Sequence, residues 1–168
     1  MRIAVTGSTK LAGTIIKRFN ADSYRVEDNI DFSKYDVFIN NAHVGFSQAT
    51  LLQKWFDVCR YDKSKTIINI SSRAALPNLS KGYSYGAQKA ALDHLADNLT
   101  YNSDKLCKII TINLGMLEDE LPSVSYEEVC NLINDIINMP EHLEMSRVFF
   151  QHRANYQEIQ DIKKSRYG

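Results

Sequence analysis

A serine, a tyrosine and a lysine in the middle of the chain have the residue types and spacing of a proton-transfer site. Ser72 ends an apolar run, Tyr85 follows it by thirteen residues, and Lys89 comes four residues later. Positions i and i+4 share one face of a helix, so the Lys89 ammonium group can approach the Tyr85 phenol. A phenol ionises near pH 10, and a neighbouring positive charge lowers that pKa. The set predicts acid–base chemistry on an alcohol or carbonyl oxygen, to which Ser72 can also hydrogen-bond.

The tyrosine–lysine spacing is weak evidence by itself, because two other pairs in the chain share it. Tyr61 and Lys65 lie in a polar segment, and Tyr101 and Lys105 lie at the far end of a predicted helix. The positions thirteen residues before these two tyrosines hold glutamine rather than serine. Position therefore favours Tyr85, which alone has a serine at the end of a predicted strand.

Alternating strands and helices must position these residues. Short apolar runs predict strands at 2–7, 23–28, 35–42, 65–72, 107–115 and 146–151, and helical periodicity predicts helices at 10–20, 48–61, 83–102 and 125–139. In the last helix, Ser125 is the predicted N-cap and Glu128 follows it at capping-box spacing. This alternation is typical of an α/β fold with a doubly wound parallel sheet of about six strands and helices on both faces. We expect a single domain over residues 1–152 and a polar C-terminal tail over residues 153–168.

The turn after the first predicted strand is typical of a dinucleotide-binding site. Gly7 would provide the tight turn, and Gly13 would let the following helix approach the sheet closely. The N–H groups at the start of that helix could bind phosphates. Glu27 or Asp28, about 20 positions on, could accept the adenosine ribose hydroxyls. A turn of this kind can equally be structural only, so it does not decide the function.

Composition excludes several classes of function. The 168 residues carry a formal net charge of zero, so nothing indicates binding to nucleic acid or to an anionic membrane. Three cysteines lie far apart without metal-ligand spacing, which favours buried thiols in a reducing compartment and predicts no metal site. No apolar run reaches membrane-spanning length, and the chain begins with a strand-like segment, so we expect no signal peptide. We expect a soluble cytoplasmic protein.

Together these motifs resemble the short-chain dehydrogenase/reductase family, a Rossmann-type family that uses NAD or NADP. The resemblance covers residues 1–151 and rests on the Thr-Gly turn, "NNA" at 40–42, "NISS" at 69–72 and "YGAQK" at 85–89. It implies an oxidoreductase acting on a small carbonyl or alcohol. Ser72 would orient the substrate, Tyr85 would be the acid/base, and Lys89 would also hold the nicotinamide ribose. The thirteen-residue gap resembles the classical branch of the family.

The same resemblance implies a set of cofactor-binding residues. Glu27 or Asp28 would repel a 2′-phosphate and favour NAD, whereas Lys10 lies where relatives that use NADP often carry a basic residue, so the preference stays open. The implied set is Thr6, Gly7, Ser8, Thr9, Lys10, Leu11, Gly13, Glu27, Asp28, Asn40, Asn41, Ala42, His43, Tyr85, Lys89 and Gly115.

Several positions depart from the family pattern. Leu11 replaces the middle glycine of the turn, or Lys10 does if the extended pattern is used, and we expect the Leu11 side chain to crowd the pyrophosphate. His43 stands where glycine is usual, either as a polar loop residue or as a cofactor or substrate contact. The family's Pro-Gly after the sixth strand is Leu114-Gly115, which changes the loop beside the nicotinamide.

The chain is also short for the family. Only eight residues separate Asp28 from the strand near Val37, so the second helix and third strand should be reduced or absent. The family's catalytic asparagine has no counterpart, and Cys59 or Arg60 stands near its place. These departures motivate an alternative, a non-catalytic nucleotide-binding or redox-sensing protein that kept the fold. A sugar-nucleotide epimerase or reductase is a lesser alternative, because the spacing and the C-terminal region are short.

Two further expectations concern assembly and the substrate. Apolar residues crowd the helix around Trp55, and those of the Tyr85 helix cannot all face one way, which predicts an exposed patch and a homodimer through it. These residues are Leu51, Leu52, Trp55, Phe56, Val58, Ala90, Leu92 and Leu99. The alternative is that they fill the gap left by the missing segments. The short acidic segment at 115–125 predicts an open pocket, or one completed by a partner subunit, and does not identify the substrate.

Overall fold

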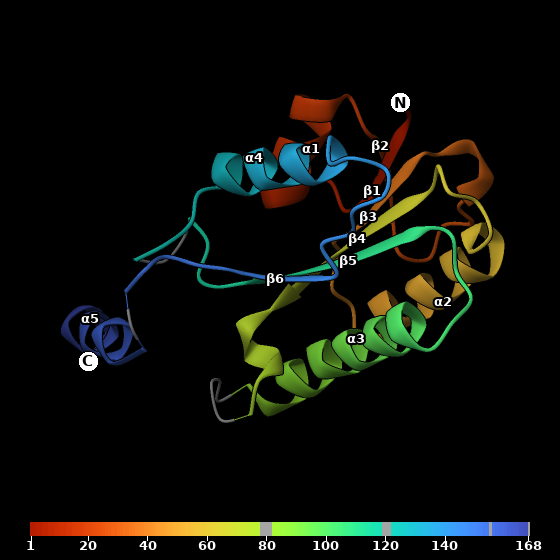
Figure 1. The fold of residues 1–168 in the computed structure, drawn as a ribbon. Helices are drawn as coiled ribbons and strands as arrows, with labels where there is room; N and C mark the ends of the chain where they lie inside the picture. Colours follow the sequence, from red (N-terminus) through yellow and green to blue (C-terminus); the bar gives the residue numbers. More distant parts are fainter. Residues whose placement is uncertain (78–81, 119–121, 155, 168) are drawn as a thin grey trace.

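A parallel sheet of six strands forms the centre of the molecule (Figure 1). The computed structural model describes residues 1–77, 82–118, 122–154 and 156–167. All neighbouring strands are parallel, in the order β2-β1-β3-β4-β5-β6. The strands are β1 (Ile3–Thr6), β2 (Asp22–Tyr24), β3 (Val37–Asn40), β4 (Thr66–Ser72), β5 (Lys108–Leu114) and β6 (Arg147–Phe150).

Helices cover both faces of the sheet, which confirms the predicted fold class. Figure 1 shows α1 (Lys10–Phe19) and α4 (Tyr126–Ile137) on one side, and α2 (Ser47–Cys59) and α3 (Tyr83–Tyr101) on the other. Side chains alternate between two cores because successive residues of a strand face opposite ways. In β4, Ile68 joins the core under α1 and α4, while Ile67 joins the core under α2 and α3.

The segment between β2 and β3 contains only a short 3₁₀ helix, η1 (Phe32–Lys34). Its Phe32 is buried and packs against Phe38 of β3, with ring centroids 4.9 Å apart. The Lys65 ammonium group donates to the carbonyl oxygens of Ser33 and Tyr35, at 2.8 and 2.7 Å. These contacts cover sheet surface that a helix would otherwise cover. The expected loss of a helix and a strand here is confirmed.

Local signals fixed the ends of some elements and not of others. Ser125 caps α4 with a capping box to Glu128, as predicted, and the backbone hydrogen bond from Ser125 lowers the pKa of the Glu128 carboxyl. Strand β2 ends at Tyr24 rather than at Asp28, because the Asp28 carboxylate accepts from the Arg25 N–H at 2.7 Å and forms a turn. The C-terminal segment expected as a polar tail contains α5 (Tyr156–Tyr167), which Figure 1 shows beyond the end of β6.

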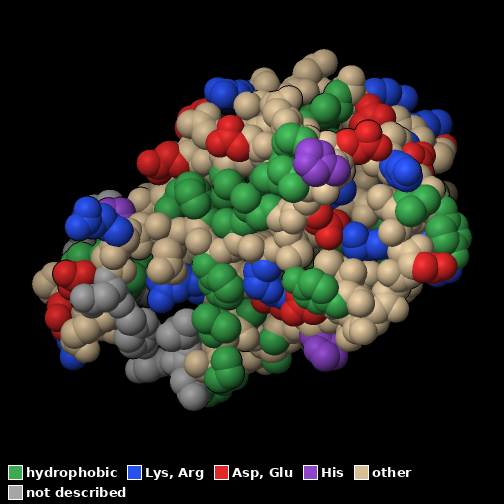
Figure 2. Space-filling view, in the orientation of Figure 1, with side chains coloured by type: hydrophobic (Ala, Val, Ile, Leu, Met, Phe, Trp, Pro, Cys, Tyr) green, Lys and Arg blue, Asp and Glu red, His purple; other side chains and the backbone are tan. Residues whose placement is uncertain are grey.

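The expected exposed patch around Trp55 is wrong. Trp55 is 1% exposed, and Leu51, Leu52 and Phe56 are buried with it in the core between α2, α3 and the sheet. Leu92 and Leu99 of α3 are buried there too, whereas Val58 is exposed. The alternative holds, because these residues fill the space beside η1. On the face shown in Figure 2, hydrophobic side chains gather instead over α4 and the edge strand β6. The homodimer stays a prediction, but the patch around Trp55 that was predicted to form its interface is not exposed.

Candidate active site

A cavity opens at the carboxyl ends of the central strands, where β3 stops before β4. Asn40 is the last residue of β3 and pairs with Asn69, while β4 continues to Ser72. Ligands of open α/β sheets bind in crevices at this edge. The cavity has a volume of about 380 Å³. Its lining is Gly7, Ser8, Thr9, Lys10, Leu11, Asn41, Ala42, His43, Ile70, Ser71, Ser72, Tyr85, Lys89, Leu114, Gly115, Leu117 and Tyr126.

Lys89 lies at the base of the cavity and is 3% exposed. Its ammonium group donates to the Oε1 of Gln48 at 2.7 Å and to the carbonyl oxygen of Ile70 at 2.9 Å. Burial disfavours the charged form and lowers the pKa of Lys89 to about 8, while the nearby Asp93 opposes this shift. A lysine in this environment changes its charge near physiological pH.

Tyr85 presents its ring to the cavity and is 40% exposed. The Lys89 nitrogen lies 5.6 Å from the centroid of this ring, so the predicted approach of the two side chains is present. His43 packs against Tyr85, with the two rings edge to face and their centroids 4.8 Å apart. His43 is therefore a cavity-lining residue that contacts the tyrosine.

Ser72 is held by the short 3₁₀ helix η2 (Arg73–Ala75) that follows β4. Its Oγ accepts a hydrogen bond from the Ala74 N–H at 3.0 Å, which leaves the hydroxyl proton available for another acceptor. Gly86 on α3 fixes the distance between η2 and α3, because a Cβ there would lie 2.6 Å from the Ala74 carbonyl oxygen. This backbone contact therefore sets how closely the segment after Ser72 approaches the start of the Tyr85 helix.

The backbone of the turn after β1 is strained at Lys10. Gly7 has a φ of +99°, as a tight turn requires, and Lys10 has a φ of +53°, which is uncommon for a residue with a side chain. Leu11 contributes to the cavity wall, but its side chain is 4% exposed and packs in the core under α1. This packing argues against the expectation that the Leu11 side chain crowds a bound pyrophosphate.

A second cavity, of about 390 Å³, continues from the first past Gly7, Ser8 and Ala42. Glu27 and Asp28, the two residues predicted to accept ribose hydroxyls, both line this second cavity. Arg25 lines it too and was not predicted, although a basic residue at the end of the second strand was a readable signal. The other lining residues are Ser23, Tyr24, Val26 and Val44.

Three residues of the predicted set do not line either cavity. Thr6 is buried, and its Oγ1 accepts from the N–H groups of Asn41 and Ala42, at 3.0 Å each, which joins the ends of β1 and β3. Asn40 is buried beside Gln48, with which it exchanges hydrogen bonds. Gly13 makes a close approach to the turn rather than to the sheet, because a Cβ there would lie 3.3 Å from the Ser8 carbonyl oxygen.

Neither residue considered near the place of the missing asparagine reaches the site. Cys59 is buried among apolar side chains, and burial raises its pKa to about 11. The Arg60 guanidinium group bonds to the Tyr61 hydroxyl and lies near Asp104 at the surface. Gln48 contacts Lys89 instead, and nothing in the type of this residue signalled it.

A charged cluster on the face of the sheet that α3 covers links β5, β6 and α3. Arg147 contacts the Asp93 and Asp97 carboxylates at 2.8 and 2.7 Å and donates to the Asn113 Oδ1 at 2.9 Å. Asn113 in turn donates to Asp93 at 2.7 Å and to the Ser72 carbonyl oxygen at 3.1 Å. The cluster therefore connects the edge strand to the strand end that carries Ser72.

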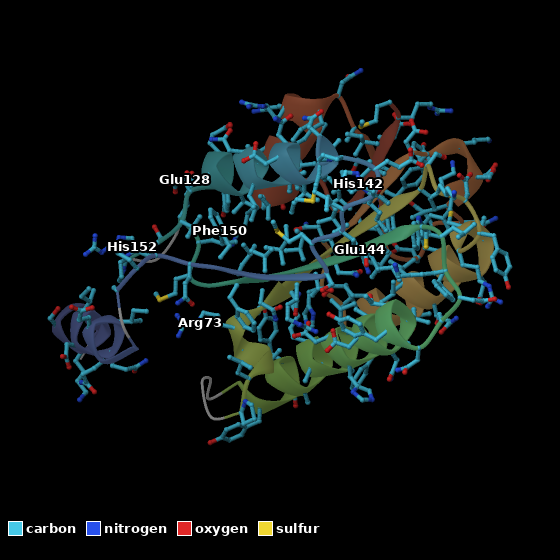
Figure 3. The ribbon with its side chains drawn as sticks, in the orientation of Figure 1. Arg73, Glu128, His142, Glu144, Phe150 and His152 are labelled. Atoms are coloured by element: carbon cyan, nitrogen blue, oxygen red, sulfur yellow. The ribbon has the colours of Figure 1, made fainter. Side chains whose placement is uncertain are left out.

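Gly115 allows the close approach of the segment after β6. A Cβ at Gly115 would lie 2.7 Å from the Gln151 Cβ and 3.7 Å from the Arg73 Cδ. Figure 3 labels Arg73, which follows Ser72 directly and lies next to the end of β5. Residues 119–121 of the short acidic segment at 115–125 lie outside the described residues, so the prediction of an open pocket is not tested there.

None of the helices in the described part of the chain is long and apolar enough to cross a membrane. In the same part of the chain, no group of three or more His, Cys, Asp or Glu side chains could hold a metal ion.

No family model and no curated protein sequence matches this chain. Solved structures do match its fold. The closed form of serine dehydrogenase complexed with NADP+ has a TM-score of 0.74 at 15% identity, covering 90% of this chain and 95% of that one. An alcohol dehydrogenase from Thermococcus sibiricus, complexed with 5-hydroxy-NADP, has a TM-score of 0.70 at 12% identity over 93% and 100% of the two chains. A short-chain dehydrogenase/reductase from Vibrio parahaemolyticus has a TM-score of 0.66 at 14% identity over 89% and 99%. The chain therefore has the fold of the short-chain dehydrogenases/reductases.

Proposed function

We propose that this protein is an NAD(P)-dependent oxidoreductase that acts on a small carbonyl or alcohol. The observation that carries the proposal is that Ser72, Tyr85 and Lys89 line one cavity with the N-terminus of α1. Two of the similar structures are complexes with NADP+ and with 5-hydroxy-NADP, which supports the choice of cofactor.

The residues around the two cavities fit such a cofactor. The first turn of α1 has no acidic residue and no side-chain cap, so its N–H groups and the positive end of the helix dipole are suited to phosphates. Gly7 keeps the turn open at the junction of the two cavities. The nicotinamide would lie toward Tyr85 and the adenosine toward Arg25 and Glu27. A bound nicotinamide supplies or accepts hydride.

The side chains of this protein would handle the proton. The Tyr85 hydroxyl would exchange a proton with the substrate oxygen, and the Ser72 hydroxyl would donate a hydrogen bond to the same oxygen. The Lys89 ammonium group would stabilise negative charge on the phenol oxygen. Two of its three N–H groups are used by Gln48 and Ile70, which leaves one for the nicotinamide ribose.

The choice between NAD and NADP depends on three charged side chains. Glu27 lines the second cavity and would repel a 2′-phosphate, whereas Arg25 in the same cavity and Lys10 in the first would attract one. Dissociation constants for NADH and NADPH, measured on the wild type and on Arg25→Ala, test this. A loss of NADPH affinity alone assigns the 2′-phosphate to Arg25, and unchanged affinities for both exclude it.

Replacing Tyr85 by Phe tests the proposal. The variant should lose turnover by at least about 100-fold, because general acid–base groups contribute roughly 10²–10⁴-fold. Its affinity for the cofactor, measured by tryptophan fluorescence, should stay within about two-fold. Tyr83→Phe is the matched control, because Tyr83 is exposed on the same helix and does not line the cavity. Undiminished turnover in Tyr85→Phe would reject the assignment.

The alternative is a nucleotide-binding protein without catalysis. Its thiols give little support to redox sensing, because Cys59, Cys107 and Cys130 are all buried and burial raises their pKa values to about 11, 12 and 11. A screen of carbonyl substrates with both reduced cofactors separates the two functions. Cofactor binding without turnover of any substrate would favour the alternative.

A further inference from the structure

Gln48 is a buried amide on the first turn of α2 whose orientation is fixed by its partners. Its Nε2 donates to the carbonyl oxygens of Asn40 and Ile70, at 2.8 and 2.9 Å. Carbonyl oxygens accept only and a lysine ammonium group donates only, so the opposite amide orientation would lose all these contacts. The Gln48 Oε1 must therefore face Lys89, which donates to it at 2.7 Å.

The position of Gln48 follows from the early end of β3. Beyond Asn40, no residue of β3 lies beside β4, so the Ile70 carbonyl oxygen takes its partners from side chains. Those partners are Gln48 and Lys89, which also bond to each other. The result is a closed triangle of hydrogen bonds that lines the cavity at Lys89, whose nitrogen lies 5.6 Å from the centroid of the Tyr85 ring.

The charged and titratable groups around Lys89 come from α3, from β6 and from the loop after β3. Tyr85 and Asp93 lie one turn away on α3, His43 contacts Tyr85 from the loop after β3, and Arg147 of β6 binds Asp93. The Asp93 carboxylate is engaged by Arg147 and Asn113. Gln48 is thus the side-chain acceptor that bonds directly to the lysine in the described part of the chain.

We propose that Gln48 is a positioning residue, which holds the Lys89 ammonium group beside Tyr85 and keeps it protonated in its buried site. This inference rests on the proposed function for its catalytic consequence, but its effect on Lys89 exists in the protein without cofactor or substrate. An uncharged acceptor suits this role, because it stabilises the cation without cancelling the positive charge that acts on Tyr85. A carboxylate at this position would cancel that charge.

The competing explanation is that Gln48 only joins the ends of β3 and β4. Two variants separate the explanations. Gln48→Met keeps the length of the side chain and removes the acceptor, so the Lys89 cation loses stabilisation. Gln48→Glu places a negative charge next to the same nitrogen, so the cation gains stabilisation. Both variants lose the donors to Asn40 and Ile70, so a purely structural role predicts the same effect from both.

The titration of Lys89 is the primary measurement. Protein labelled with 13C at the lysine Cε is titrated by NMR, and the Lys89 signal is assigned by its loss in Lys89→Met. The midpoint should move down by about one pH unit in Gln48→Met and up by a similar amount or more in Gln48→Glu. Gln53→Met and Gln53→Glu are matched controls on the same helix, because exposed Gln53 bonds only to Asp57 among its described contacts, and they should leave the midpoint unchanged.

Turnover supplies the second measurement. Carbonyl reduction by Gln48→Met should fall about five-fold relative to the wild type at pH 8 and recover toward it at pH 6.5, where Lys89 is mostly protonated again. Midpoints that stay unchanged, or that move in the same direction in both Gln48 variants, would overturn the proposal, as would a loss of turnover that is equal at both pH values. If Gln48→Glu does not fold, an unmoved midpoint in Gln48→Met overturns it alone. Wild-type protein without turnover would refute the proposed function, while the NMR titration would still decide the role of Gln48.

Discussion

Asn40 and Gln48 each donate a side-chain hydrogen bond to the backbone carbonyl oxygen of the other, both at 2.8 Å. This exchange fastens the start of α2 to the last residue of β3. Because the backbone carbonyl oxygens of Asn40 and Gln48 both have partners, β3 can end early without leaving either of them unpaired. The same Gln48 then reaches Lys89, so the support of the strand end and the placement of the lysine depend on one side chain.

Gly86→Ala should destabilise the protein and disturb the site. The added Cβ would lie 2.6 Å from the Ala74 carbonyl oxygen, so α3 and η2 must separate. Overpacking of this kind costs roughly 1–3 kcal/mol, which urea unfolding would measure. Ala87→Gly is the control on the exposed side of the helix and should cost no more than about 1 kcal/mol, from helix propensity alone. Equal stability of Gly86→Ala and the wild type would show that η2 moves freely.

Arg147→Met should lower the free energy of unfolding by roughly 2 to 3 kcal/mol. The substitution leaves Asp93, which is mostly buried, without its cation, and a fully buried pair broken in this way costs about 3–5 kcal/mol. Arg18→Met is the matched control, because Arg18 pairs with Glu127 at the surface and such pairs contribute about 0–1 kcal/mol. Urea unfolding of both variants checks the difference, and similar losses would contradict a special role for the cluster.

Lys89 should make stability depend on pH in the alkaline range. Its pKa is about 8 in the folded protein, against 10.5 for an ordinary lysine. Between these values the unfolded chain holds the proton and the folded chain has released it, so the free energy of unfolding rises with pH. The destabilisation that burial of the cation causes is present below pH 8 and disappears toward pH 10.5.

The measurement compares the wild type with Lys89→Met by urea unfolding at pH 7 and pH 10. Other titrating groups cancel in the difference between the two proteins. The wild type should gain roughly 2–3 kcal/mol relative to the variant over this range. A constant difference would show that Lys89 keeps an ordinary pKa in the folded protein.

Arrangements that depend on near neighbours in the chain could be predicted from the sequence. Tyr85 and Lys89 share a helix face because they are one turn apart, and Ser72 ends a strand because an apolar run ends there. The capping box of Ser125 and Glu128 is also local. The alternation of strands and helices then predicted the parallel sheet, because parallel strands need crossover connections.

Contacts between residues far apart in the chain could not be predicted in this way. Gln48 bonds to Lys89 across 41 positions, and a glutamine early in a helix gives no sign of a buried partner. The apolar residues around Trp55 are buried because Phe32 and its neighbours leave space for them where a helix is missing. Arg147 reaches Asp93 only because β6 lies beside β5. Such contacts depend on how whole elements pack, and the order of residues along one element does not contain that information.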